Sequence, residues 1–484
     1  MLKLNDIVNA LEGSENFTPG VNENPKDILH KISFQRKFTP QQEMAMKDAN
    51  FKISIDSRTI RRGDVFIALK GKNFDGHSFL GEAFKKGAAA AIVSREKEAH
   101  MSGGKPYILI GVDDTKKALK RLAFTLREKF KGKVIAVTGS NGKTTTKEMI
   151  AHVLSSNFDV LKNKGTQNNE IGVPLTIFRL KNDHQIIVFE LGASRNGEIF
   201  SLKEMTKPDL GVITNIGQTH LEFLKTEKDV LSAKLELLTG ESHRVKTAFL
   251  NFDDKNLKKA AISLKNQVIS FGTRKDCQYR ASNISLSDRG ISFLINEKYK
   301  IRLQTIGQHN IYNALAAWAV GRQLGVSVAD SQESLATFTF PPHRLQFMKI
   351  KDSFLIDDSY NANPQSVKAA LKALSSIKQV QNKIACLADM CELGPASQRL
   401  HYEIGLEAGI MGIDTVISFG QFSEFVIRGA EKGGVENCVN VKSKKEMLQW
   451  LLDNARGKQA VLFKGSRVIK MEEIVRCFIN SYTS

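Results

Sequence analysis

Cysteine is scarce in this chain, and long hydrophobic runs are missing. The 484 residues include five cysteines, too few and too scattered for a disulfide framework or a zinc site: Cys277, Cys386, Cys391, Cys438 and Cys477. We therefore expect a reducing compartment. No apolar run approaches the ~20 residues that span a bilayer, and the first residues lack the pattern of a signal peptide. These absences together predict a cytoplasmic protein.

Acidic residues are outnumbered by basic ones. The chain has 51 Asp and Glu against 70 Lys and Arg, a formal net charge of +19. Such a balance fits polyanionic partners: nucleotides, nucleotide-sugars, nucleic acid or an anionic membrane. No single run of basic residues dominates and no aromatic-rich RNA-binding signature is present, so a generally basic surface is favoured over nucleic-acid binding. The length suggests two to four domains.

The most informative stretch covers residues 133–146. Residues 134–137 are a short apolar run, typical of a strand buried on both faces. Gly139-Ser-Asn-Gly142 then predicts a turn, and apolar residues at helical spacing follow it. A strand, a glycine turn and a helix start together make an anion site. Lys143 adds a positive charge there, and the hydroxyl of Thr144 can ligate Mg²⁺. An ordinary turn with a surface lysine is the disfavoured alternative, because glycine, lysine and threonine coincide where phosphate chemistry needs them.

This loop departs from the usual phosphate loop G-x-x-x-x-G-K-[ST]. The first glycine of that pattern would fall at Val137, whereas the glycines here are Gly139 and Gly142. The loop is therefore shorter than usual.

Three α/β units are expected along the chain. Residues 1–113 form a small α/β unit with strands at 53–55, 65–69 and 90–94, and with a helix end at 83–89. Residues 114–338 form the nucleotide unit, a mostly parallel sheet with helices on both faces and strands at 134–137, 186–189, 210–214, 247–250 and 268–271. Within it, residues 279–306 alternate as antiparallel strands do, and residues 307–313 open an alanine-rich helix. Residues 339–484 form a Rossmann-like unit with strands at 354–357, 384–388, 416–419 and 461–463.

Polar residues at strand ends suggest a metal site. Glu190 ends a buried strand beside the phosphate loop, where Mg²⁺ needs hard oxygen ligands. His220 follows another strand in the same way and is a reasonable second ligand. The alternatives are a capping glutamate and a structural histidine. Lys234, taken by itself, is a lysine on a helix surface. The adjacent Asn168 and Asn169 suggest an ordered polar loop.

The chain resembles the Mur ligases over essentially its full length. The pieces that carry the resemblance are Asp56-Ser-Arg58, Lys70-Gly71, Phe74-Asp75, Thr138 to Lys147, Asn168 to Pro174, Glu190 to Ala193, His220 to Glu222, Lys234, His309-Asn310 with Asn313, His343-Arg-Leu345, Asp357 to Pro364, Asp389-Met with Glu392 to Gly394, and Lys464 to Arg467. The block from Asp357 to Pro364 is the most discriminating. It is similar to the branch that adds D-alanyl-D-alanine to UDP-N-acetylmuramoyl-tripeptide, making the pentapeptide precursor of peptidoglycan. Gly165-Thr-Gln-Asn and Cys391 depart modestly from the family pattern.

The resemblance implies an ATP-dependent peptide ligase with an acyl-phosphate intermediate, and it implies a role for each matching residue. ATP would be held by Thr138, Gly139, Ser140, Asn141, Gly142, Lys143, Thr144, Thr145, His309, Asn310, Asn313 and Asp358. Two Mg²⁺ ions would be held by Thr144, Glu190, His220 and Lys234, the last as a carbamate. The substrates would be bound by Ser57, Arg58, Lys70, Asn168, Asn169, Asn361, Asn363 and Lys464. The catalytic set would be Lys143, Glu190, His220, Lys234 and Arg344.

Other functions stay open at this point. One alternative is a sister amide ligase, either the ligase that adds the third peptide residue or folylpolyglutamate synthase. The former carries a diagnostic Asp-Asn-Pro-Arg that this sequence lacks. Another alternative is a P-loop ATPase switch without ligase activity. The third residue of the tripeptide is not identifiable from the sequence. We expect a monomer, with no nucleic-acid partner and no stable membrane insertion.

Overall fold

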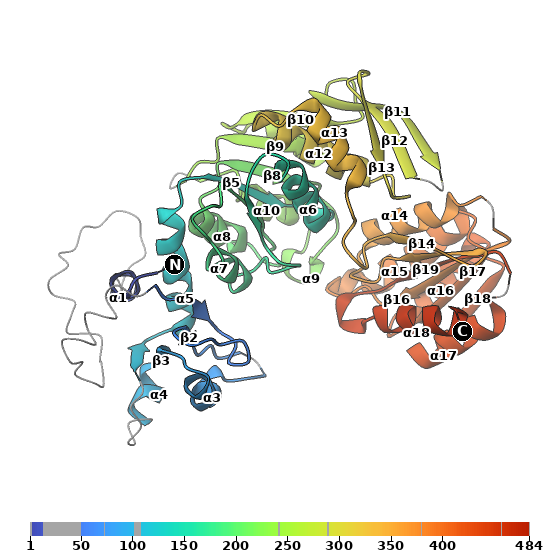
Figure 1. Ribbon diagram of the computed structural model, residues 1–484. Helices are drawn as coiled ribbons and strands as arrows, with labels where there is room; N and C mark the ends of the chain where they lie inside the picture. Colours follow the sequence, from blue (N-terminus) through green and yellow to red (C-terminus); the bar gives the residue numbers. More distant parts are fainter. Residues whose placement is uncertain are drawn as a thin grey trace.

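The described part of the chain forms three sheets with flanking helices (Figure 1). The computed structural model describes residues 2–12, 50–71, 73–100, 108–240, 243–287, 290–378, 380–455 and 457–483. The sheets follow one another along the chain, and each is parallel except at an edge or an extension. The predicted three-unit α/β architecture is therefore confirmed. Among the described helices, none combines the length and the apolar character needed to cross a membrane.

The first sheet is small and parallel, in the order β1-β2-β3-β4. Three of its strands were predicted, and β4 was not. Its elements are α1 (Leu4–Glu12), β1 (Ile53–Ser54), β2 (Val65–Ile67), a 3₁₀ turn η2 (Gly76–Phe79), α3 (Leu80–Lys85), β3 (Ala90–Ser94), α4 (Arg95–His100) and β4 (Leu109–Val112).

Helix α5 (Thr115–Lys129) joins the first sheet to the second. Asp114 caps its start, since the carboxylate accepts hydrogen bonds from the backbone N–H groups of Lys116 and Lys117. The helix packs against α1 and β3 on one side and against α7 (Gly172–Ile177) and α8 (Glu198–Thr206) on the other. Leu119 and Leu122 are fully buried in a core that runs through both units. The two units therefore share apolar packing across this helix.

The second sheet has nine strands in the order β13-β12-β11-β10-β9-β8-β5-β7-β6. Its central strand β5 (Lys133–Thr138) is apolar because both of its faces are covered. Val134 and Ala136 pack in the core beneath α7 and α8, whereas Ile135 and Val137 pack beneath α6 (Lys143–Leu154) and α12 (Asn310–Gln323). Strands β11 to β13 extend the sheet with antiparallel pairing, as predicted.

The remaining elements of this unit complete the sheet and its covering helices. They are β6 (Val160–Lys162), β7 (Ile186–Glu190), β8 (Leu210–Ile213), α9 (Leu221–Leu224), α10 (Glu227–Leu235), β9 (Thr247–Asn251), α11 (Lys255–Ala261), β10 (Gln267–Gly272), β11 (Tyr279–Ser287), β12 (Gly290–Ile295), β13 (Tyr299–Leu303) and α13 (Val328–Thr337).

The third sheet has six strands in the order β14-β15-β19-β16-β17-β18, with β14 antiparallel at the edge. Helices α14, α15 and α16 cover one face and α17 and α18 the other. The elements are β14 (Gln346–Ile350), β15 (Ser353–Asp357), α14 (Pro364–Ser375), β16 (Asn382–Ala388), η3 (Gly394–Ala396), α15 (Ser397–Ile410), β17 (Thr415–Phe419), α16 (Ser423–Gly433), β18 (Asn437–Asn440), α17 (Lys444–Asn454), β19 (Gln459–Lys464), η4 (Arg467–Ile469) and α18 (Glu472–Thr483). Strands β14 and β18 were not predicted.

Candidate active site

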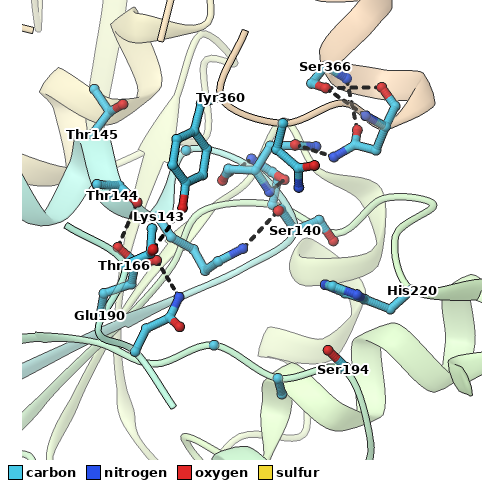
Figure 2. A pocket seen from close by; sticks show the side chains of 18 of the residues that line it. Ser140, Lys143, Thr144, Thr145, Thr166, Glu190, Ser194, His220, Tyr360 and Ser366 are labelled. Carbon is cyan, nitrogen blue, oxygen red and sulfur yellow. Dashed lines mark hydrogen bonds between the residues drawn. The ribbon is translucent and has the colours of Figure 1, made fainter. Parts of the chain in front are cut away.

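A cleft of about 1080 Å³ lies where the carboxyl ends of β5, β7 and β8 face the third unit. Parallel strands end at the same edge, so their following loops converge there. The residues from the central unit come mainly from the turn after β5, the loop 166–170 and the loops after β7 and β8. The third unit contributes Arg344, Leu345, residues of the segment 358–369 and Lys464. Figure 2 shows the phosphate-loop side chains beside Glu190, His220 and Tyr360.

Glycine is required at both ends of the phosphate-binding turn. Gly139 has φ 140° and Gly142 has φ 78°, a region that favours glycine. A Cβ on Gly142 would lie 2.7 Å from Asn313 Oδ1. The turn is held from outside as well, because Asn141 N donates to Asn215 Oδ1 at 2.9 Å. Its conformation is therefore set by the fold before any phosphate binds.

Lys143 begins helix α6 and folds back over the turn. Its Nζ donates to the carbonyl oxygens of Gly139 (2.8 Å) and Ser140 (2.9 Å). Burial lowers the pKa of Lys143 to about 8; Glu190 opposes that shift and the nearby Arg344 adds to it. At neutral pH the lysine therefore carries a positive charge at the mouth of an anion site.

Glu190 is the buried acceptor of two side-chain hydrogen bonds. Thr144 Oγ1 donates to its Oε2 and Asn168 Nδ2 to its Oε1, each at 2.7 Å. Its backbone N–H donates to Asn163 Oδ1 at 2.7 Å, which fixes the end of β7. The hydroxyl and the carboxylate are the hard oxygen ligands that Mg²⁺ takes alongside substrate phosphates. Within the described parts of the chain, no three His, Cys, Asp or Glu side chains gather into a metal site. A metal here would thus need the hydroxyl of Thr144 as well.

His220 connects the central unit to the third unit. It has φ 56°, and its Nδ1 lies 2.5 Å from Glu392 Oε2. This hydrogen bond lowers the pKa of Glu392. A histidine that donates from one ring nitrogen to a carboxylate presents the other as a lone pair, the arrangement usual for metal-ligating histidines.

Lys234 is buried, so its reading from the sequence as a lysine on the helix surface is wrong. Only 1% of the residue is exposed, and Nζ donates to the carbonyl of Ala193 at 3.1 Å. Burial lowers its pKa to about 7 and the charge of Lys143 adds to the shift. Lys234 lies on the buried side of α10 with Val230 and Ala233. The sequence reading placed it on the surface because a lysine side chain is rarely fully buried.

Comparison with known proteins gives one consistent family. Three of its profiles match: "Mur ligase family, catalytic domain" at residues 52–125, "Mur ligase middle domain" at 137–321 and "Mur ligase, glutamate ligase domain" at 343–467. The UDP-N-acetylmuramoyl-tripeptide–D-alanyl-D-alanine ligase of Bacillus subtilis (strain 168) is 36% identical over 432 residues, covering 89% of this chain and 93% of that protein. The chain belongs to the Mur ligase family. The resemblance drawn from the motifs is confirmed.

Solved Mur ligase structures share the fold over the same extent. A crystal structure of MurF from Acinetobacter baumannii has a TM-score of 0.80 at 32% identity, covering 88% of this chain and 93% of that one. MurF ligase from Thermotoga maritima in complex with ADP has a TM-score of 0.78 at 28% identity, covering 89% and 97%.

In this Mur ligase, most of the expected ATP-binding residues line the cleft. They are Ser140, Asn141, Gly142, Lys143, Thr144, Thr145, His309, Asn310, Asn313 and Asp358. Thr138 is instead fully buried and its hydroxyl donates to the carbonyl of Leu191 at 2.8 Å. That contact gives it a structural role behind the turn.

The two asparagines of α12 form a buried chain behind the phosphate loop. Thr146 Oγ1 donates to Asn313 Oδ1 at 2.9 Å, and Asn313 Nδ2 donates to Asn310 Oδ1 at 2.8 Å. Both asparagines border the cleft while holding α12 to α6. Asn251 and Tyr312 border the same part of the cleft, and the sequence motifs did not indicate them.

The expected residues of the third unit are linked to one another. Lys464 is buried and its Nζ donates to Asp358 Oδ2 (2.5 Å) and to the carbonyl of Asn361 (2.9 Å). Asn363 caps α14 and also donates to Asn141 Oδ1 at 2.7 Å. The third unit therefore contacts the tip of the phosphate loop directly.

Two of the expected substrate residues have other partners. Asn169 Oδ1 accepts from the backbone N–H groups of Ile171 (3.1 Å) and Gly172 (2.9 Å), so it stabilises the start of α7. Asn168 is held against Glu190 by the hydrogen bond already described.

The expected residues of the first unit lie outside the cleft. Ser57 is buried and donates to Glu82 Oε2 at 3.0 Å, whereas Arg58 is exposed and pairs in two places with Asp56. The backbone of Lys70 forms an isolated antiparallel β-bridge with that of Asp75. Within the described residues, none of these three lines the cleft. A ligand that reached both places would have to be long.

Proposed function

We propose that this chain joins D-alanyl-D-alanine to UDP-N-acetylmuramoyl-tripeptide at the expense of ATP, giving the pentapeptide precursor of peptidoglycan. The observation that carries the proposal is similarity over nearly the whole length to ligases of that name, at 36% identity across 89% of this chain. The cleft agrees with it, because a phosphate loop faces polar residues of a separate unit. The enzyme is an ATP-dependent amide ligase, which argues against a P-loop switch.

The chemistry begins with a carboxylate, which is a poor electrophile. Phosphorylation by the γ-phosphate of ATP converts it to an acyl phosphate. Both reactants are anions, and the positive charges of Lys143 from the central unit and Arg344 from the third unit offset their repulsion. The amine of D-alanyl-D-alanine then attacks the acyl carbon, loses a proton and expels phosphate. Closing the units over ATP would exclude water, which would otherwise hydrolyse the acyl phosphate.

Thr144 and Glu190 would hold one Mg²⁺ ion, and Glu190 with His220 a second. All three residues line the cleft, and Nδ1 of His220 is bonded to Glu392, which leaves the other ring nitrogen for a metal. Mg²⁺, when bound, supplies positive charge that stabilises the transferring phosphoryl group. Asn168 orients Glu190, and Glu392 orients His220.

Lys234 would complete the second site as a carbamate. A neutral amine reacts with CO₂, and the lowered pKa of about 7 keeps a sizeable neutral fraction at physiological pH. The carbamate carries a negative charge and two oxygens, which suit a hard cation where an ammonium group would repel it. Its position behind Ala193, which lines the cleft, supports the proposal.

In this proposal, each of three regions of the chain has its own binding role. Residues 1–113 hold the UDP end through Ser57, Arg58 and Lys70. Residues 114–338 bind ATP and the metals, and residues 339–484 place the dipeptide through Asn361 and Asn363. Asn310 and Asn313 face the adenine, and Asp358 the ribose. We place the reaction in the cytoplasm, where the five unpaired cysteines stay reduced, and expect a monomer.

Product analysis tests the proposal. Purified protein with ATP, Mg²⁺, a UDP-N-acetylmuramoyl-tripeptide and D-alanyl-D-alanine should yield pentapeptide, ADP and phosphate by mass spectrometry. A panel of tripeptides with diaminopimelate, lysine or another diamine at the third position would define that preference. Product formed only with free glutamate and folate would refute the assignment, as would ATP turnover independent of any amine.

A further inference from the structure

Tyr360, in the loop between β15 and α14, lies between two arginines. The guanidinium carbon of Arg344 is 4.0 Å from the centre of its ring, and that of Arg467 is 5.4 Å away. A guanidinium over an aromatic face is held by cation–π attraction. Arg467 is also paired with Glu472 at 2.7 Å. Of the two arginines, Arg344 is the one that lines the cleft.

The backbone around Arg344 is fixed by the same loop. Its neighbours His343 and Leu345 have φ 62° and 51°, a strained region for residues with a Cβ. Tyr360 N donates to the carbonyl of His343 at 3.1 Å, and Leu345 N donates to Asp358 Oδ1 at 3.0 Å. Residues 358–360 thus hold the backbone on both sides of Arg344, and the ring holds its side chain.

The hydroxyl of Tyr360 reaches across to the central unit. It donates to Thr166 Oγ1 at 2.7 Å, as Figure 2 shows. The carbonyl of Thr166 accepts from the backbone N–H of Asn168 at 2.8 Å, and the side chain of Asn168 donates to Glu190. A single side chain of the third unit therefore connects the cationic Arg344 to the loop that orients the metal-site carboxylate.

We propose that Tyr360 is a positioning residue of the ligation reaction, its ring setting Arg344 and its hydroxyl docking the third unit onto the loop around Thr166. The inference rests on the proposed function for its kinetic consequence. Arg344 and Glu190 come from different units, so both are correctly placed only when those units are docked. The Tyr360–Thr166 hydrogen bond therefore couples docking of the two units to the correct placement of Arg344 and Glu190.

The hydroxyl is tested by a double-mutant cycle. Tyr360→Phe keeps the ring over Arg344 and removes only the bond to Thr166, and Thr166→Val removes the partner. Each substitution should lower kcat roughly three- to tenfold, because that is the effect expected from the loss of one hydrogen bond. The double variant should lose no more than either single variant, because both remove the same interaction. Additive losses would overturn the docking role.

The ring is tested by Tyr360→Leu against Arg344→Ala. Removing the ring should lower kcat roughly a hundredfold, as expected for a misplaced catalytic group. The KM values for ATP and dipeptide should change little, because the lost contact acts in the transition state. In the Thr166→Val background, where the hydroxyl bond is already absent, adding Tyr360→Leu to Arg344→Ala should cause no further loss. A further multiplicative loss would show that Tyr360 does not act through Arg344.

Hydrogen exchange gives a readout that needs no turnover. With ADP and Mg²⁺ bound, the amides of residues 163–170 should lose protection equally in Tyr360→Phe and Thr166→Val. Tyr299→Phe, a half-buried tyrosine on β13 outside the cleft, is the matched control and should change neither rate nor protection. Unchanged protection in both test variants would overturn the inference even if wild-type protein makes no pentapeptide. A wild type without product, but with the expected protection changes, would instead count against the proposed function alone.

Discussion

Thr144 and Glu190 meet at the edge of the central sheet, with Oγ1 of the first 2.7 Å from Oε2 of the second. They come from the first turn of α6 and the last residue of β7. Strand β5 pairs with β7 in parallel register, with Val137 opposite Glu190, so both chains reach the same edge together. The hydroxyl and the carboxylate become neighbours through that register. Four predictions follow from the site built around them, and a fifth concerns the first unit.

Lys143→Ala should abolish ligation while the protein stays folded. The lysine contacts only carbonyl oxygens of its own turn, so little packing is lost. A charge contact made in the transition state is typically worth roughly 10²–10³ in rate. Steady-state kinetics with a melting curve measures both effects, and Lys131→Ala, an exposed lysine just before β5, serves as control. Near-normal turnover by folded Lys143→Ala would place the phosphates elsewhere.

Lys234 should be carbamylated when CO₂ is present. The activity lost on replacing Lys234 should be partly restored by added short carboxylates. Lys234→Ala should lose most activity and regain part of it with short carboxylates, which can replace the missing oxygens. Labelling with ¹³C-bicarbonate should give a carbamate NMR signal that Lys234→Met lacks. Full activity of Lys234→Ala, together with an unmodified lysine in a structure determined at neutral pH, would rule the carbamate out.

The unmodified Lys234 should also make stability depend on pH. Its folded pKa of about 7 lies below the ordinary value of 10.5, so between these values the unfolded chain binds more protons. Stability therefore rises with pH across this window, by at most about 1.4 kcal/mol per pH unit. In CO₂-free buffer, the melting temperature of the wild type, measured relative to that of Lys234→Met, should rise between pH 7 and pH 10. A constant difference would show an unperturbed lysine.

Asn168 and Asn169 should behave differently although they are adjacent. Asn168→Leu removes the donor that orients Glu190, so Mg²⁺ affinity should fall roughly 10–100-fold. Asn169→Ala removes the acceptor at the start of α7, so stability should fall by about 1 kcal/mol with Mg²⁺ affinity unchanged. Metal titration in the presence of ADP and thermal unfolding separate the two. Equal effects of both variants on Mg²⁺ would contradict these roles.

Arg58→Ala should weaken the UDP-linked substrate without slowing the chemistry. The residue is exposed in the first unit, away from the cleft, and a charged hydrogen bond to phosphate is worth roughly 10–100-fold in affinity. KM for that substrate should rise with kcat unchanged, because the contact is equal in ground and transition states. Arg95→Ala, another exposed arginine of the same unit, is the control. Calorimetry with UDP alone should show the same loss of affinity. Unaltered UDP binding would mean that the UDP site does not include Arg58.

The sequence by itself determined the phosphate loop, the three α/β units and the family. These are local features: an apolar run marks β5, glycines mark the turn, and motif residues are adjacent or regularly spaced. The short edge strands β14 and β18 were not predicted because none of their residues is fully buried, so neither shows an apolar run. The burial of Lys234 was not predicted because its partner, the carbonyl oxygen of Ala193, lies in a loop 41 residues earlier in the chain.

Only the tertiary structure decided which distant residues act together. Tyr360 belongs to a block that the sequence singled out, yet nothing local indicates its bond to Thr166 or its stacking on Arg344. Glu392 was likewise visible in its motif, while its contact with His220 was not. Arg344 and Tyr360 both belong to the third unit, whereas the Tyr360–Thr166 and Glu392–His220 pairs join the central unit to the third unit. Their distances depend on how whole units dock, and docking is set by packed surfaces contributed from many parts of the chain.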